Sequence, residues 1–116
     1  MKKMLLVDDE EGIQMLYREE LEDEGYEVIS AYTGEEGIQK FNDESPDLVI
    51  LDIQMPGMNG IETLRQMKME NPKLPVILSS AYNEYKQDLG AWASDEYVVK
   101  SSNINDLKEA VKKHLS

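Results

Sequence analysis

The chain has 116 residues and carries 24 aspartates and glutamates against 12 lysines and arginines, which gives a formal net charge of −12. This charge repels phosphate backbones and anionic lipid, so direct binding to nucleic acid is not expected. The absence of cysteine excludes a disulfide framework and a thiolate metal site, and no apolar stretch approaches the length of a membrane span. We expect one soluble, cytoplasmic domain over residues 1–116, with no effector domain and no membrane insertion.

Five short apolar runs have the length and composition of buried strands. In chain order they are residues 3–7 (KMLLV), 26–30 (YEVIS), 48–51 (LVIL), 75–78 (PVIL) and 96–99 (EYVV). The segments between and after them have helical periodicity. They predict helices over residues 11–24, 34–43, 61–70, 83–91 and 104–115, of which 83–91 has the weakest pattern.

The first and last predicted helices are clearly amphipathic. Their apolar faces contain Ile13, Leu16, Tyr17 and Leu21 in the first, and Ile104, Leu107, Val111 and Leu115 in the last. Strands that alternate with such helices form a parallel sheet covered on both faces, because right-handed crossovers place the helices there. The sequence therefore predicts an α/β fold.

Polar residues directly follow four of the apolar runs. They are Asp8 and Asp9 after the first run, Asp52 after the third, Ser79 and Ser80 after the fourth, and Lys100 after the fifth. Ligands of open parallel sheets bind beyond the carboxyl ends of the strands, where these residues are expected to meet. Three crowded carboxylates would repel one another unless a cation lay among them, and such oxygen ligands suit Mg²⁺. With Lys100 and the Ser80 hydroxyl beside the metal, this edge is suited to hold a phosphoryl group on Asp52.

Four motifs at these strand ends match a known family. They are Asp8-Asp9, the run Asp-x-x-Met-Pro-x-Met-x-Gly from Asp52 to Gly60, Ser80-Ala81, and the segment from Tyr97 to Lys100. Together they closely resemble the receiver domain of bacterial two-component response regulators, over essentially the whole chain. The resemblance implies a flavodoxin-like three-layer sandwich, with a five-stranded parallel sheet of order 2-1-3-4-5 and five helices.

The resemblance also implies the roles of single residues. Asp52 would be the phosphoacceptor, and the cofactor Mg²⁺ would be held by Asp8, Asp9, Asp52 and the backbone carbonyl of Gln54. Ser80 and Lys100 would contact the phosphoryl oxygens, and Ser80 and Tyr97 would form the switch. The partners would be a sensor histidine kinase or a histidine phosphotransfer protein as donor, and a target protein as output. The chain would then be a signalling phosphoacceptor that catalyses only its own phosphorylation and dephosphorylation.

Other interpretations stay open for some of these residues. Asp8 and Asp9 could serve only to cap the first helix, where carboxylates suit the helix dipole. Ser101 stands where most receivers have proline, which gives some weight to the alternative of a pseudo-receiver, an interaction module that switches without phosphate. The intact site residues argue against that alternative, namely Asp8, Asp9, Asp52, Ser80 and Lys100. His114, the one histidine, is expected to complement the dipole of the last helix.

Two other classes of protein are disfavoured. A flavin carrier of the same fold needs a loop after the first strand that binds the phosphate of the cofactor. In this chain the acidic stretch DDEEG stands there and would repel that phosphate. A haloacid-dehalogenase-like phosphatase needs a second acid two residues after its aspartate nucleophile, where this chain has Gln54.

Overall fold

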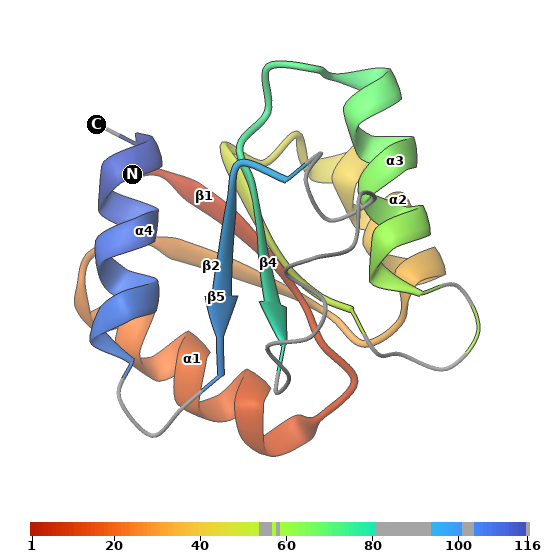
Figure 1. Cartoon of the computed structure of the whole chain (residues 1–116). Helices are drawn as coiled ribbons and strands as arrows, with labels where there is room; N and C mark the ends of the chain where they lie inside the picture. The colour runs from red at the N-terminus through yellow and green to blue at the C-terminus, as the bar shows by residue number, and fades with distance from the viewer. Residues whose placement is uncertain (54–56, 58, 81–93, 101–103, 116) are drawn as a thin grey trace.

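A parallel β-sheet forms the centre of the chain (Figure 1). The structure, a computed structural model, describes residues 1–53, 57, 59–80, 94–100 and 104–115. The strands are β1 (Lys3–Val7), β2 (Glu27–Ala31), β3 (Leu48–Asp52), β4 (Val76–Ser80) and β5 (Glu96–Val99). They pair in parallel in the order β2-β1-β3-β4-β5, which confirms the predicted sheet.

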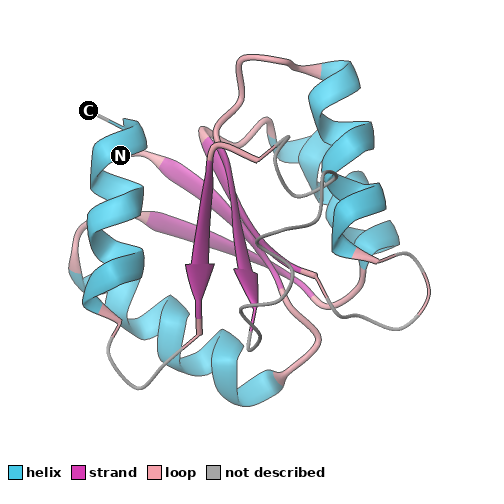
Figure 2. Cartoon of the chain, in the orientation of Figure 1, coloured by secondary structure: helices cyan, strands magenta, loops and turns pink. Residues whose placement is uncertain are grey.

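Helices cover both faces of this sheet (Figure 2). Within the described residues they are α1 (Glu11–Asp23), α2 (Gly34–Glu44), α3 (Gly60–Glu70) and α4 (Asn105–Leu115). The helix expected over residues 83–91 lies outside the described residues, so α4 corresponds to the last predicted helix. Among the described helices, none is long and apolar enough to cross a membrane.

Each face of the sheet has its own apolar core. The α1/α4 layer consists of Met4, Leu6, Tyr17, Leu21, Val28, Leu48, Ile50, Ile77, Val98, Leu107, Ala110 and Val111. The α2/α3 layer consists of Leu5, Val7, Ala31, Phe41, Val49, Leu51, Ile53, Leu64, Met67, Leu74, Val76 and Leu78. Consecutive strand residues alternate between the two layers, as the pleat of a strand requires.

The inner face of α1 differs from the prediction at one position. Tyr17 and Leu21 are buried as expected, but Leu16 is 44% exposed, so its placement on the apolar face was wrong. Gln14 is buried instead, and its amide donates hydrogen bonds to the carbonyl oxygens of Leu6, Asp8 and Ala31 at 3.1, 3.0 and 2.8 Å. These bonds tie α1 to the ends of β1 and β2 through a polar side chain, and Leu16 is left toward solvent.

The start of α3 lies against the end of β3. The Gly60 amide donates to the Ile53 carbonyl at 2.9 Å, and the Asn59 side chain caps the helix by accepting from the Glu62 amide at 3.0 Å. A Cβ atom built on Gly60 would collide with the backbone carbonyl oxygen of Asp52. Glycine at position 60 therefore lets the chain return closely onto the strand that carries Asp52.

The substitution Gly60→Ala is expected to lower the free energy of unfolding by about 2 kcal/mol, because the backbone must move to admit the methyl group. Gly12→Ala in α1 is the matched control, since a Cβ on Gly12 meets nothing within 4 Å. That control is expected to gain about 0.5–1 kcal/mol from helix propensity. Urea unfolding measures both, and equal effects of the two substitutions would contradict the collision.

Candidate functional site

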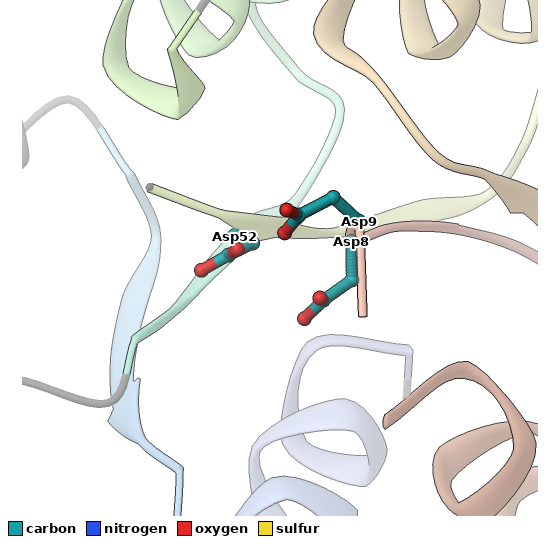
Figure 3. Close-up of side chains that lie close together, drawn as sticks. All are labelled: Asp8, Asp9 and Asp52. Carbon is teal, nitrogen blue, oxygen red and sulfur yellow. The ribbon is translucent and has the colours of Figure 1, made fainter. Parts of the chain in front are cut away.

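Three carboxylates gather at the carboxyl ends of β1 and β3 (Figure 3). Asp8 and Asp9 follow β1, and Asp52 is the last residue of β3. One oxygen atom from each of the three lies within 4.8 Å of the others. Asp8 and Asp52 are 2% and 4% exposed, whereas Asp9 is open to solvent. The strand register thus brings acids from distant parts of the chain together at one corner of the sheet, where two of the three are buried.

The pleat of the strands decides which side chains share this corner. Leu51 belongs to the α2/α3 layer, so Asp52 turns toward the α1/α4 layer. The same alternation in β4 sends Ser79 to the α1/α4 layer and Ser80 to the α2/α3 layer. The two adjacent serines therefore lie on opposite faces of the sheet.

Lys100 supplies a positive charge between the two buried acids. Its Nζ lies 2.6 Å from Asp8 Oδ2 and 3.3 Å from Asp52 Oδ1, with Glu10 Oε1 more distant at 3.8 Å. The side chain is only 8% exposed, and the Lys100 amide donates to the Ser80 carbonyl at 2.6 Å, which fixes where the side chain begins. The sequence led us to expect Lys100 near an anion, but not Asp8 as its shortest partner.

The electrostatics of the site follow from burial and from crowding. Burial, together with the nearby Asp8 charge, raises the pKa of Asp52 to about 6, although Lys100 opposes the rise. Burial by itself lowers the pKa of Lys100. The hydrogen bond to Asp8 and the charges of Asp52 and Asp8 outweigh that effect, so this pKa lies above its ordinary value. A protonated lysine therefore only partly compensates the crowded carboxylates.

The donor set fits Mg²⁺. Two oxygens bound to one octahedral Mg²⁺ lie roughly 3–4 Å apart, because each metal–oxygen distance is about 2 Å. The separations of up to 4.8 Å among Asp8, Asp9 and Asp52 are close to this range, so small side-chain movements or bridging waters would complete the shell. Carboxylate oxygens are the ligands that this ion prefers. The fourth expected ligand, the carbonyl of Gln54, lies outside the described residues, as does Ser101.

The two expected switch residues share the opposite face of the sheet. Ser80 is 1% exposed at the end of β4, and Tyr97 is partly buried against the α2/α3 layer. The register pairs Tyr97 with Leu78 and Ser80 with Val99 on neighbouring strands. The Tyr97 ring thus lies on the same side of the sheet as the Ser80 hydroxyl.

The capping interpretation of Asp8 is not what the structure shows. Glu10 is the N-cap residue of α1, and its side chain makes no capping hydrogen bond. The Asp8 carboxylate accepts a hydrogen bond from the Glu10 amide at 2.9 Å and points its other oxygen at Lys100. Asp8 therefore belongs to the charge cluster.

His114 has a partner that the sequence did not reveal. Its Nε2 lies 3.1 Å from Glu96 Oε1 at the start of β5, and Lys113 Nζ lies 3.4 Å from the same oxygen. These contacts, the one to His114 above all, lower the pKa of Glu96, although burial acts in the opposite direction. His114 therefore joins the end of α4 to β5 at the opposite end of that strand from Lys100.

Comparisons with known proteins agree with this geometry. The model of the response regulator receiver domain family matches residues 4–112. Sporulation initiation phosphotransferase F of Bacillus subtilis (strain 168) is 38% identical over 119 residues, covering 98% of this chain and 94% of the relative. The alkaline phosphatase synthesis transcriptional regulatory protein PhoP of the same organism is 37% identical, and the chain spans 47% of its length.

Solved structures give the same result. Response regulator protein TrrA from Thermotoga maritima, in complex with Mg²⁺-BeF, is 50% identical with a TM-score of 0.97, and the match covers 99% of this chain and 100% of that one. A structure of the histidine kinase ThkA in complex with TrrA contains a chain that is 50% identical to this one, with a TM-score of 0.94. The match covers 100% of this chain and 100% of the matched chain. The chain thus belongs to the response regulator receiver domain family.

Proposed function

We propose that Asp52 accepts a phosphoryl group from a phosphohistidine donor and that Asp8, Asp9 and Lys100 make this transfer possible. The observation that carries the proposal is the buried ion cluster, in which Lys100 lies between Asp8 and Asp52 beside a third carboxylate. A charged lysine and three acids at one strand edge are the parts that phosphoryl transfer requires, namely a nucleophile and neutralising charge.

The chemistry of the transfer is a displacement at phosphorus. An ionised Asp52 oxygen forms a bond to phosphorus while the bond from phosphorus to the donor nitrogen breaks, and that nitrogen keeps the electron pair. Lys100 stabilises the charge on the transferring oxygens, and Ser80, the last residue of β4, donates a hydrogen bond to one of them across the edge of the sheet. Mg²⁺, held by Asp8, Asp9, Asp52 and the Gln54 carbonyl, would supply further charge neutralisation when bound.

The phosphorylated site would signal through Ser80 and Tyr97. A phosphoryl group adds negative charge and acceptor oxygens. Because Asp52 and Ser80 are the last residues of β3 and β4, these oxygens draw the Ser80 hydroxyl around the edge of the sheet toward Asp52. Tyr97 lies on the same face as Ser80, so a movement of Ser80 changes the space open to its ring. The output is a change in the surface near β5 that a target protein reads.

The partners of this cycle follow from the same proposal. A sensor histidine kinase or a histidine phosphotransfer protein would supply the phosphoryl group, as suggested by the TrrA complex with a histidine kinase. The convergence of Asp8, Asp52 and Lys100 argues against the pseudo-receiver, because a module that switches without phosphate has no need for a buried lysine between two acids.

The test is intact mass spectrometry after incubation with acetyl phosphate and Mg²⁺. The wild type is expected to gain one phosphoryl group, and the gain is expected to disappear in Asp52→Asn and in wild type with EDTA. Asp43→Asn, at an exposed position in α2, is the matched control and should be labelled like wild type. An adduct that persists in Asp52→Asn, or that forms equally in EDTA, would overturn the proposal.

A further inference from the structure

A buried glutamine holds the backbone at the end of β1, and the proposed transfer gives it no role. Gln14 lies near the start of α1 and is 2% exposed. Its side-chain nitrogen Nε2 lies 3.1 Å from the Leu6 carbonyl oxygen, 3.0 Å from that of Asp8 and 2.8 Å from that of Ala31. Three acceptors around one atom require a donor there, so this atom is the nitrogen of the amide and not its oxygen.

One of these bonds reaches the peptide unit between two of the clustered acids. The Asp8 carbonyl, which accepts from Gln14, belongs to the peptide that joins Asp8 to Asp9. The Asp8 amide donates to the Ala31 carbonyl at 3.0 Å, and the same carbonyl accepts from Gln14. Gln14 therefore fixes the backbone where the chain leaves β1 and bends at Asp9.

The carboxylates of the two neighbouring acids are held in different ways. One oxygen of Asp8 accepts from the Glu10 amide at 2.9 Å, and the other lies 2.6 Å from Lys100 Nζ. Among the described residues, the Asp9 carboxylate forms no hydrogen bond or ion pair, and it is open to solvent. The direction in which the Asp9 side chain leaves the backbone therefore depends on the orientation of the planar peptide before it.

A glutamine at this position has a cost, which argues against a role in packing alone. Within the described part of the chain, Gln14 Oε1 is buried without a hydrogen-bond partner. A buried acceptor without a partner lowers the stability of the fold. An apolar side chain of similar volume would fill the same space without that cost, but it could not donate to the Asp8 carbonyl.

We propose that Gln14 is a positioning residue of the Mg²⁺ site, and that it acts through the peptide between Asp8 and Asp9 to hold the Asp9 carboxylate in place for the metal. The inference rests on the proposed function, because the Mg²⁺ site is the one that transfer to Asp52 uses. Groups that hold the ligands of a metal change its affinity although they do not touch it. Loss of the Gln14 donor therefore weakens Mg²⁺ binding.

The experiment is a titration of the folded protein with Mg²⁺ alone, followed by the chemical shifts of backbone amides. Gln14→Met keeps a similar volume and removes the donor, and it is expected to raise the Mg²⁺ dissociation constant about tenfold. With acetyl phosphate, the Mg²⁺ concentration at half-maximal rate should rise by the same factor, while the rate at saturating Mg²⁺ stays within about twofold of wild type.

Leu21→Val is the matched control, because Leu21 is fully buried further along the same helix and contributes packing alone. It is expected to lower the urea midpoint and to keep the wild-type Mg²⁺ dissociation constant. A merely structural role of Gln14 would give Gln14→Met this same pattern, and that result would overturn the inference. If Gln14→Met does not fold, Gln14→Asn decides in the same way, because its shorter side chain withdraws the donor from the Asp8 carbonyl.

A double variant tests whether Gln14 acts through Asp9. Asp9→Asn by itself is expected to weaken Mg²⁺ binding, and adding Gln14→Met should then raise the dissociation constant less than twofold further. Effects that multiply would overturn the inference. Equal dissociation constants in wild type and Gln14→Met would overturn the inference alone. A wild type that binds Mg²⁺ but gains no phosphoryl group would overturn the proposed function, and the dissociation constants would still decide the role of Gln14.

Discussion

Lys100→Met is expected to lower the free energy of unfolding of the metal-free protein by about 3 kcal/mol and to slow phosphorylation about 100-fold. The first effect arises because the substitution leaves the buried carboxylates of Asp8 and Asp52 without their cation, and a buried pair that loses one partner costs this much. The second arises because a fixed positive charge on the transferring oxygens is lost.

Mg²⁺ should distinguish these two effects. Urea unfolding in EDTA and in excess Mg²⁺ is expected to show that the metal restores most of the lost stability, since it neutralises the same acids. The phosphorylation rate should remain low in Mg²⁺, because the lysine acts on the phosphoryl group. Lys73→Met, at an exposed position, is the control and should change neither quantity. A Lys100→Met protein as stable as wild type in EDTA would contradict the ion cluster.

Asp52→Asn is expected to raise the free energy of unfolding of the metal-free protein by about 2–3 kcal/mol at neutral pH. The pKa of Asp52 is raised to about 6 by burial and by Asp8, above the value of about 3.9 for an unfolded chain. The native state therefore binds this proton more tightly than the unfolded state. The contribution of Asp52 to stability falls as pH rises from about 4 to about 6, and the full penalty remains at higher pH. Asparagine removes the charge and with it the penalty.

Urea unfolding in EDTA between pH 5 and pH 8 measures this difference. The gain in Asp52→Asn should be about half its full size at pH 5 and should reach its full size above pH 7. Asp43→Asn, at an exposed position, should show no such dependence. A gain that shrinks as pH rises would mean that the pKa of Asp52 is lowered in the folded protein.

The sequence predicted the fold because its main signals are local. Short apolar runs and amphipathic segments placed the five strands and the described helices to within about two residues of their positions. The error at Leu16 has a clear cause, since periodicity ranks side chains by polarity alone. The periodic pattern therefore does not predict that the Gln14 amide donates hydrogen bonds to three backbone carbonyl oxygens inside the fold.

The site could be predicted to the level of its edge but not of its contacts. The carboxyl ends of parallel strands lie at one edge of the sheet, and this rule predicted that Asp8, Asp9, Asp52 and Lys100 lie close together. The division of Ser79 and Ser80 between opposite faces follows from the pleat and was within reach of sequence reasoning. The pairing of His114 with Glu96 depends on how α4 packs against β5, which no local pattern encodes.

The origin of Lys100 at the far end of the chain from Asp8 bears on how the molecule folds. In a chain in which only β1, β3 and β4 have paired, Asp8 and Asp52 already lie close together. The positive charge of Lys100 reaches them only when β5 pairs with β4. In such a partly folded chain the carboxylates repel one another, and the ion pairs of Lys100 with Asp8 and Asp52 are not yet formed. Docking of the last strand should therefore be strongly favoured once the rest has formed, and Mg²⁺ present during refolding should accelerate the earlier steps by taking the place of the missing lysine.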